Sequence, residues 1–139
     1  MDTLSSLIKE VVMVTASHLM KHNLAKVPYS ASVSEAARVM RERKIGSVFV
    51  ERKLQIVGIV TETDIVREVV GAGRVPDTMI VADIMSSPVI GIDATRPITE
   101  AADLMERNGT RHLAVLQSGD IIGVLSVRDL LHPVSIDEF

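Results

Sequence analysis

A seven-residue pattern occurs twice in this sequence and constrains the possible folds more than any other feature. It runs glycine, two apolar residues, a hydroxyl residue, two further residues and an aspartate, and its copies are residues 58–64 and 123–129. Each copy ends a β-type apolar run, and its hydroxyl residue, Thr61 or Ser126, suits the N-cap of a helix. Asp64 or Asp129 then falls in the first helical turn, where the helix dipole favours a negative charge.

The pattern belongs to a longer internal repeat. From Thr15 onward the chain aligns with itself without a gap at an offset of 65 residues, so that Gly58 corresponds to Gly123. Further identical pairs are Met20 and Met85, Glu35 and Glu100, Ala36-Ala37 and Ala101-Ala102, Met40 and Met105, and Val50 and Val115. A long ungapped repeat is a strong sign of internal duplication. Two units are too few for a solenoid, so we expect the repeats to pack against each other as a pseudo-dimer.

Each repeat is predicted to have the order β-α-β-β-α after a short helical turn, which makes the fold class α+β. Apolar residues at i, i+3, i+4 and i+7, from Val33 to Met40, predict a helix with one apolar face, and Ser32 with Glu35 predicts its capping box. Two β-type runs joined by a turn predict a hairpin. The expected segments are helical turns at 16–21 and 81–86, strands at 25–27 and 89–92, helices starting at 33 and 98, hairpins over 47–60 and 112–125, and helices from about 61 and 126.

These segments divide the chain. The first repeat spans residues 15–72 and the second spans 80–133, and a linker at 73–79 containing glycine and proline joins them. Residues 1–14 place apolar side chains at helical spacing and predict an N-terminal helix, which either caps the core or contacts a partner. Residues 134–139 are left as a C-terminal tail.

Composition excludes several functional classes. The 139 residues are 47% apolar but only 2% aromatic, and the net charge is −3. Few aromatic rings argue against base stacking with single-stranded nucleic acid, and the absence of a long basic run argues against binding a phosphate backbone. Because the sequence has no cysteine, disulfides and thiolate chemistry are excluded. We therefore predict no nucleic-acid partner.

Membrane insertion and export are not predicted either. The first apolar stretch contains Lys9 and Glu10 and lacks the pattern of a signal peptide. No apolar run approaches the ~20 residues that a membrane span needs. The expected location is cytoplasmic.

The duplicated layout resembles the cystathionine-β-synthase (CBS) domain pair, also called a Bateman module. The resemblance covers residues 15–132 and rests on segments that match the family twice at one offset. These are the patterns at 58–64 and 123–129, the helix cores at 35–40 and 100–105, the segment 82–85 with 18–20 as its weaker twin, and the segment 109–115.

The resemblance implies a module without catalytic activity that binds AMP, ADP, ATP or S-adenosylmethionine in two clefts between the repeats. In such a cleft an aspartate accepts hydrogen bonds from both ribose hydroxyls, and the nearby Thr or Ser meets a phosphate oxygen. The first predicted site comprises Thr61, Asp64, Ile92, Asp93 and Thr95. The second comprises Ser126, Asp129, Val27, Pro28, Tyr29 and Ser30, with Ser47 and Val48 beside the adenine.

The resemblance also implies that the two sites are unequal. Arg111 and His112 match a position from which basic side chains reach phosphates in the family, whereas the first repeat has Gly46 and Ser47 there. The first repeat therefore lacks positive charge at this position, and we expect the two sites to bind with different affinity.

Each of these assignments has a simpler alternative. Asp64 and Asp129 suit a first helical turn whether or not a ligand binds. Arg111 and His112 could form a solvated strand end. His18 and His22 have a spacing that can hold a metal, but no third ligand is evident, and we predict no metal site.

Three functional classes remain for the whole chain. The first is a regulatory module that binds adenine nucleotides, requires no other cofactor and signals energy state to an unidentified protein partner; a sensor of S-adenosylmethionine is a variant of it. The second is a structural or dimerisation module without a ligand. An enzyme is disfavoured because no assembled base and nucleophile are evident. A homodimer is predicted from surplus apolar residues in the closing helices, namely Ile65, Val66, Val69, Val70, Leu130 and Leu131.

Overall fold

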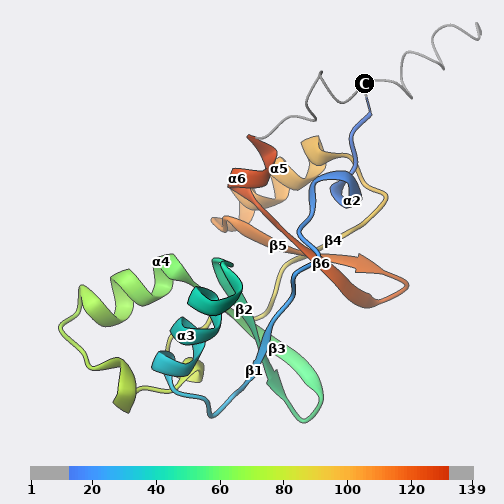
Figure 1. Ribbon diagram of the computed structural model, residues 1–139. Helices are drawn as coiled ribbons and strands as arrows, with labels where there is room; N and C mark the ends of the chain where they lie inside the picture. The colour runs from blue at the N-terminus through green and yellow to red at the C-terminus, as the bar shows by residue number, and fades with distance from the viewer. Residues whose placement is uncertain (1–12, 132–139) are drawn as a thin grey trace, which may run out of the picture. The chain divides into compact units, whose positions relative to one another are not determined.

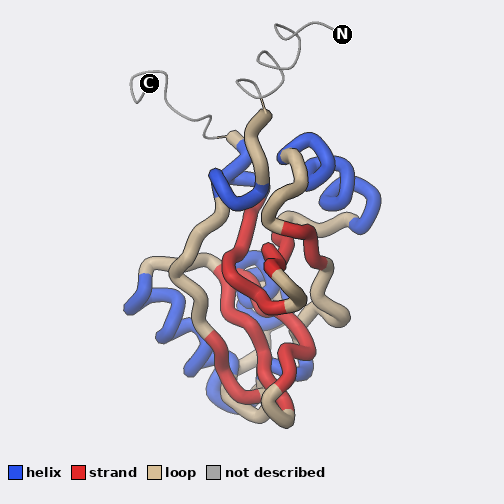
Figure 2. Tube along the Cα trace, turned by 90° about the vertical axis from the view of Figure 1, so that its right-hand side faces the viewer, coloured by secondary structure: helices blue, strands red, loops and turns tan. Residues whose placement is uncertain are grey.

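The computed structural model describes residues 13–131 (Figure 1). Within this range the chain is α+β, as predicted, and contains two three-stranded sheets of the same order, β1-β2-β3 and β4-β5-β6. The predicted N-terminal helix falls almost wholly on residues 1–12 and the predicted tail on 134–139, so both lie outside the described residues. Helices and strands are distinguished by colour in Figure 2.

The strands of both sheets pair in the same way. The first sheet contains β1 (Lys26–Pro28) parallel to β2 (Ser47–Arg52), which is antiparallel to β3 (Gln55–Thr61). The second contains, in the same relation, β4 (Gly91–Asp93), β5 (His112–Gln117) and β6 (Asp120–Ser126). Each hairpin has a register shift at an equivalent place, after Val50 and after Val115. The two predicted hairpins are confirmed.

One long helix packs against the central strand of each sheet. These helices are α3 (Val33–Arg43), which contacts β2, and α5 (Ile98–Asn108), which contacts β5. Ala36 and Ala101 are completely buried, and their small side chains let each helix lie close to its sheet. Ser32 Oγ accepts a hydrogen bond from the Glu35 N–H at 3.0 Å. Only this half of the predicted capping box forms among the described residues.

The remaining helices are short. They are α2 (Ala16–Leu19), α4 (Glu62–Ile65), the π-helix η1 (Val66–Val70), the 3-10 helices η2 (Pro76–Thr78) and η3 (Val81–Asp83), and α6 (Val127–Leu130). The stretch predicted as a linker, 73–79, is more ordered than its glycine and proline suggested. The Met79 carbonyl accepts from the Val33 N–H at 2.8 Å, and the Met79 side chain is buried in the first core.

The compact units of the structure do not coincide with the sequence repeats. One unit runs from Asn23 to Val89, and the other joins the described residues up to His22 with those from Ile90 onward. The segment leading into each repeat therefore packs with the other repeat. Lys21 forms an antiparallel bridge with Val124 of β6, and the equivalent bridge joins Ser86 to Ile59 of β3.

This exchange accounts for the glycine of the repeated pattern. A Cβ atom built on Gly58 would lie 2.5 Å from Met85 Sδ and 3.0 Å from the Ser86 carbonyl oxygen. A Cβ on Gly123 would collide in the same way with Met20, which lies in the other leading segment. Both methionines pack against the hydrophobic core of the unit they enter. The glycines are thus required by close tertiary packing between a leading segment and a sheet.

Candidate functional site

The aspartate of the first repeat caps the helix in which it lies. Thr61 ends β3 and is the N-cap of α4. Its N–H donates to Asp64 Oδ2 at 2.9 Å, and the Asp64 N–H donates to Thr61 Oγ1 at 3.2 Å. This reciprocal pair satisfies two backbone donors that the start of a helix leaves unpaired. Within residues 13–131, no hydrogen bond or ion pair engages Asp64 Oδ1.

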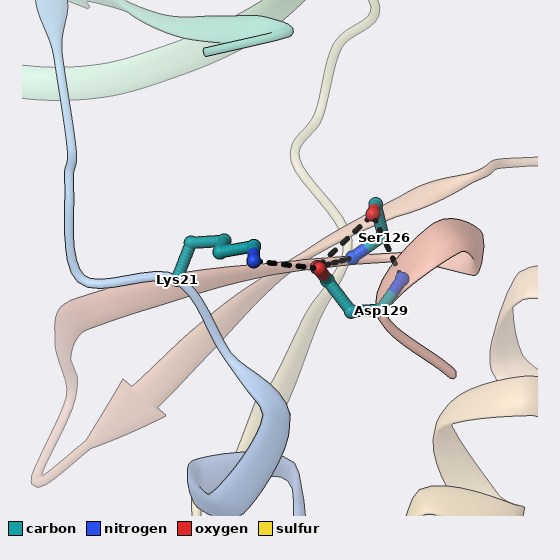
Figure 3. A network of polar contacts seen from close by, with 3 residues as sticks. All are labelled: Lys21, Ser126 and Asp129. Atoms are coloured by element: carbon teal, nitrogen blue, oxygen red, sulfur yellow. Dashed lines mark hydrogen bonds and ion pairs between the residues drawn. The ribbon is translucent and has the colours of Figure 1, made fainter. Parts of the chain in front are cut away.

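The aspartate of the second repeat makes the same cap and one contact more (Figure 3). Asp129 Oδ2 accepts from the Ser126 N–H at 2.8 Å and from Ser126 Oγ at 3.0 Å, and the Asp129 N–H donates to Ser126 Oγ at 3.3 Å. Lys21 Nζ lies 3.6 Å from Asp129 Oδ1. Both carboxylate oxygens of Asp129 therefore have partners, whereas Asp64 has a partner on one oxygen.

The two aspartates also differ in burial. Asp129 is only 5% exposed, while Asp64 is half-buried. A buried carboxylate is costly unless it is paired and hydrogen-bonded, and Asp129 is both. The simpler assignment, that these aspartates stabilise a helix start, is thus observed in both repeats.

Four more predicted site residues lie at the same sheet ends as the caps. Ser47 is the cross-strand partner of Thr61, and His112 is the cross-strand partner of Ser126. The Arg111 carbonyl accepts from the Val127 N–H at 3.0 Å, which places exposed Arg111 beside the start of α6. Val48 follows Ser47 and is only 1% exposed, so its side chain belongs to the core.

The remaining predicted residues lie at the opposite end of their own sheets. Pro28 pairs with Glu51 and Asp93 pairs with Leu116, at the ends of β2 and β5 remote from the caps. The same sheet ends hold Val27, Tyr29, Ser30, Ile92 and Thr95. Within a compact unit the structure therefore does not bring these residues to the caps. Their pairing across repeats stays a prediction.

Some of these residues are already engaged. Val27 and Ile92 are 2% and 3% exposed and form part of the two cores. The Tyr29 ring is covered by the Arg52 guanidinium, 4.7 Å from its centroid. The Thr95 N–H and Oγ donate to Asp93 Oδ1 at 2.9 and 2.7 Å, and these bonds hold the pKa of Asp93 below its usual value.

Sequence reasoning missed Lys21 as a site residue. Its position is the counterpart of Ser86, so the two repeats differ there, and this difference is visible in the alignment. The contact with Asp129 was not visible, because it depends on the leading segment packing with the other repeat.

His18 Nδ1 accepts from the Thr15 N–H at 3.0 Å, which gives this histidine a capping contact. Over residues 13–131 no three His, Asp or Glu side chains gather in a group that could hold a metal. In the same range no helix has the length and apolarity needed to cross a bilayer.

The duplicated fold and its paired caps define a two-repeat module, and comparison with known proteins identifies its family. The family model described as CBS domain matches residues 16–71 and again residues 81–135. The chain therefore belongs to the CBS domain family and carries a tandem pair, as the resemblance predicted.

Three known proteins illustrate the relationship. An uncharacterized protein of Methanopyrus kandleri is 42% identical over 99 residues, which are 70% of this chain and 50% of that protein, so the chain spans about half the length of this curated relative. A hexameric CBS-CP12 protein from bloom-forming cyanobacteria is similar in structure with a TM-score of 0.81 and 32% identity, over 90% of this chain and 73% of that one. A CBS domain protein from Pyrobaculum aerophilum, solved in complex with AMP, has a TM-score of 0.73 and 30% identity, over 84% and 90%.

Proposed function

We propose that this chain is a regulatory CBS pair without catalytic activity that binds adenosine nucleotides (AMP, ADP or ATP) and signals their level to a protein partner. The observation that carries the proposal is the repeated cap. In both repeats an aspartate is held rigidly at a sheet end by reciprocal hydrogen bonds through Oδ2. A structure of similar fold and 30% identity contains AMP, which supports the choice of ligand class.

The proposed recognition follows from the carboxylate chemistry. A carboxylate whose Oδ2 is fixed by its own helix presents Oδ1 in one orientation, and hydrogen bonds from a ribose diol to a charged acceptor are stronger than bonds between neutral groups. Thr61 or Ser126 stands beside it and offers a hydroxyl. Of the remaining predicted residues, those with side chains exposed enough to contact a ligand are Pro28, Tyr29, Ser30, Asp93, Thr95, Arg111 and His112. The side chains of Ser47, Val48, Val27 and Ile92 are buried, and we propose that these four residues contribute through their backbone.

The proposed sites are unequal in charge. The cap of the second repeat is flanked by the exposed cations Arg111 and Arg128, whereas Gly46 and Thr63 occupy the equivalent positions in the first repeat. Arginine binds phosphate through charge-assisted, often bidentate hydrogen bonds. We propose that the second repeat therefore provides the stronger phosphate site.

The test is titration calorimetry of the wild type, Asp64→Asn and Asp129→Asn with AMP, ADP, ATP and S-adenosylmethionine. Asparagine keeps an oxygen that can cap the helix but removes the charge. We expect each variant to lose one class of site by about one to two decades in affinity and to keep the other. A ligand at one hundred times its dissociation constant adds about 2.7 kcal/mol per site, so melting curves provide an independent check.

The outcomes separate the candidate functions. If the chain binds S-adenosylmethionine in preference to the nucleotides, its function is to sense that methyl donor and not the energy state. If none of the four compounds binds or shifts the melt at millimolar concentration, the structural module without a ligand is the correct function. Identical isotherms for all three proteins would place the ligand away from the caps.

We also propose a homodimer, on a narrower surface than the sequence suggested. Of the six apolar residues in the closing helices, Val69 is completely buried, and Ile65 and Leu130 pack against the cores. Val66 and Val70 in one compact unit are 60% and 65% exposed, and Leu131 in the other is 74% exposed. Light scattering at micromolar concentration tests this, and a monomer mass for the wild type would exclude it.

A further inference from the structure

The contact between Lys21 and Asp129 distinguishes the two caps in a way that the repeated pattern does not. Lys21 comes from the segment between α2 and β1, and its backbone is tied to Val124 by two hydrogen bonds of 2.8 and 3.0 Å. Ser86 is tied to Ile59 in the same way, at 2.9 and 3.1 Å. The same backbone position thus carries an ammonium group at one cap and a hydroxyl at the other.

The Lys21 side chain is held loosely although its backbone is fixed. Its Nζ is 3.6 Å from Asp129 Oδ1, longer than a strong charge-assisted hydrogen bond, and the side chain is 66% exposed. The ammonium group keeps its contact with water and can turn away, but the buried carboxylate loses stability unless another donor replaces it. The ammonium group can therefore leave the carboxylate when a stronger anion arrives, and the backbone bridge keeps it within reach of the cap.

Loss of the contact with Lys21 leaves Asp129 Oδ1 without its charged partner. The carboxylate is 5% exposed, and its Oδ2 is occupied by Ser126, so Oδ1 is the oxygen left for a ligand (Figure 3). A ribose diol that donates to Oδ1 would compete with Lys21 for this oxygen. If the ligand is an uncharged nucleoside, the ammonium group loses its counter-ion and gains none. If the ligand carries a phosphate, the ammonium group exchanges one anion for another.

We propose that Lys21 is a specificity-determining residue that makes the site at Asp129 select nucleotides over nucleosides. It occupies Asp129 Oδ1 while the site is empty and moves to the phosphate when a nucleotide binds. The site at Asp64, where Ser86 replaces the lysine, lacks this selection. The inference rests on the proposed nucleotide function.

The test compares AMP with adenosine in an Asp64→Asn background, where the Asp129 site is the one measured. We expect Lys21→Met, which keeps the length of the side chain without its charge, to weaken AMP binding about tenfold and to leave adenosine binding unchanged or tighter. Lys21→Arg should restore most of the preference. Melting temperature checks that each variant is folded.

Lys53 provides a control for the loss of one positive charge. It is an exposed lysine in the turn between β2 and β3, and it belongs to neither predicted site. Lys53→Met should leave the ratio of the AMP and adenosine dissociation constants unchanged.

The failures are distinguishable. If the wild type binds none of AMP, ADP, ATP and adenosine, the proposed function is wrong. If the Asp64→Asn protein binds AMP but adding Lys21→Met leaves its ratio of AMP to adenosine affinity unchanged, the proposed function stands and the role of Lys21 is overturned. A change of the ratio in Lys53→Met as large as in Lys21→Met would also overturn it, because the effect would then come from net charge.

Discussion

At equivalent turns the two repeats have the same backbone conformation but different types of residue. The helix before each hairpin ends in a left-handed residue, which is Lys44 in the first repeat (φ 56°) and Gly109 in the second (φ 61°). The hairpin turns have two left-handed residues each, the second being Leu54 (φ 65°) or Gly119 (φ 84°). Glycine adopts this conformation without a steric penalty, and lysine or leucine does not.

The sheet glycines behave in the opposite way. Gly58 and Gly123 are glycine in both repeats, and neither has a left-handed φ. Each instead makes room for a methionine of the other repeat's leading segment. At a turn, a lysine or leucine can adopt the left-handed conformation at a modest cost in free energy. Where a sheet residue touches the backbone of another segment, only glycine fits.

The largest effect is expected from adding a single methyl group to the sheet. Gly58→Ala should lower the free energy of unfolding by about 1–3 kcal/mol, because its Cβ would meet both Met85 Sδ and the Ser86 backbone. Gly46→Ala is the matched control, since its Cβ would meet only the exposed and flexible Glu62 side chain. Chemical denaturation measures both. Equal losses in the two variants would contradict the packing explanation.

An intermediate effect is expected from exchanging the turn residues between repeats. Gly119→Leu should cost about 1 kcal/mol because it forces leucine into the left-handed region. Leu54→Gly should stabilise by a smaller amount, since glycine relieves the strain but gains freedom in the unfolded chain. Denaturation midpoints of the two variants give the test. Destabilisation by Leu54→Gly would show that the relief of strain is smaller than the entropy that glycine gains in the unfolded chain.

The smallest effect is expected from acid. Asp93, whose counterpart is Pro28, has a lowered pKa, caused first by the Thr95 N–H, then by the Thr95 hydroxyl and Arg96. Its hydrogen bonds therefore add stability above the unfolded pKa of 3.8, and this contribution is lost as pH falls through the lower folded value. Asp93→Asn should flatten the decline of the melting temperature slightly between about pH 5 and about pH 3. A steeper decline of the melting temperature in Asp93→Asn would contradict a stabilising role for the ionised Asp93.

Much of the fold was predictable because its signals are local. The 3.6-residue spacing of Val33, Ala36 and Met40 predicts α3, and pairs of β-type apolar runs joined by a turn predict both hairpins. The caps at Thr61 and Ser126 formed as predicted, because a hydroxyl followed three residues later by a carboxylate is a short-range motif. The site residues were predicted from family resemblance, and their role in binding stays a prediction.

Other features were not predictable from local pattern. The stretch 73–79 was predicted as a linker from its glycine and proline, but Met79 is drawn into the first core, which composition does not reveal. The capping box at Ser32 was predicted to be reciprocal, and only the bond from Glu35 N–H formed. Glu35 is exposed, so water can satisfy its side chain as well as the backbone does.

The sequence by itself determined the α+β class, the duplication, the order of elements and the positions of the two capping aspartates, because periodicity and capping act over a few residues. Only the tertiary structure decided which sheet each leading segment joins. Two equivalent sheet edges exist at an offset of 65 residues, so a leading segment matches both edges equally well in pattern. In the folded chain each leading segment packs on the sheet of the other repeat. This packing places Lys21 beside Asp129 and Met85 against Gly58.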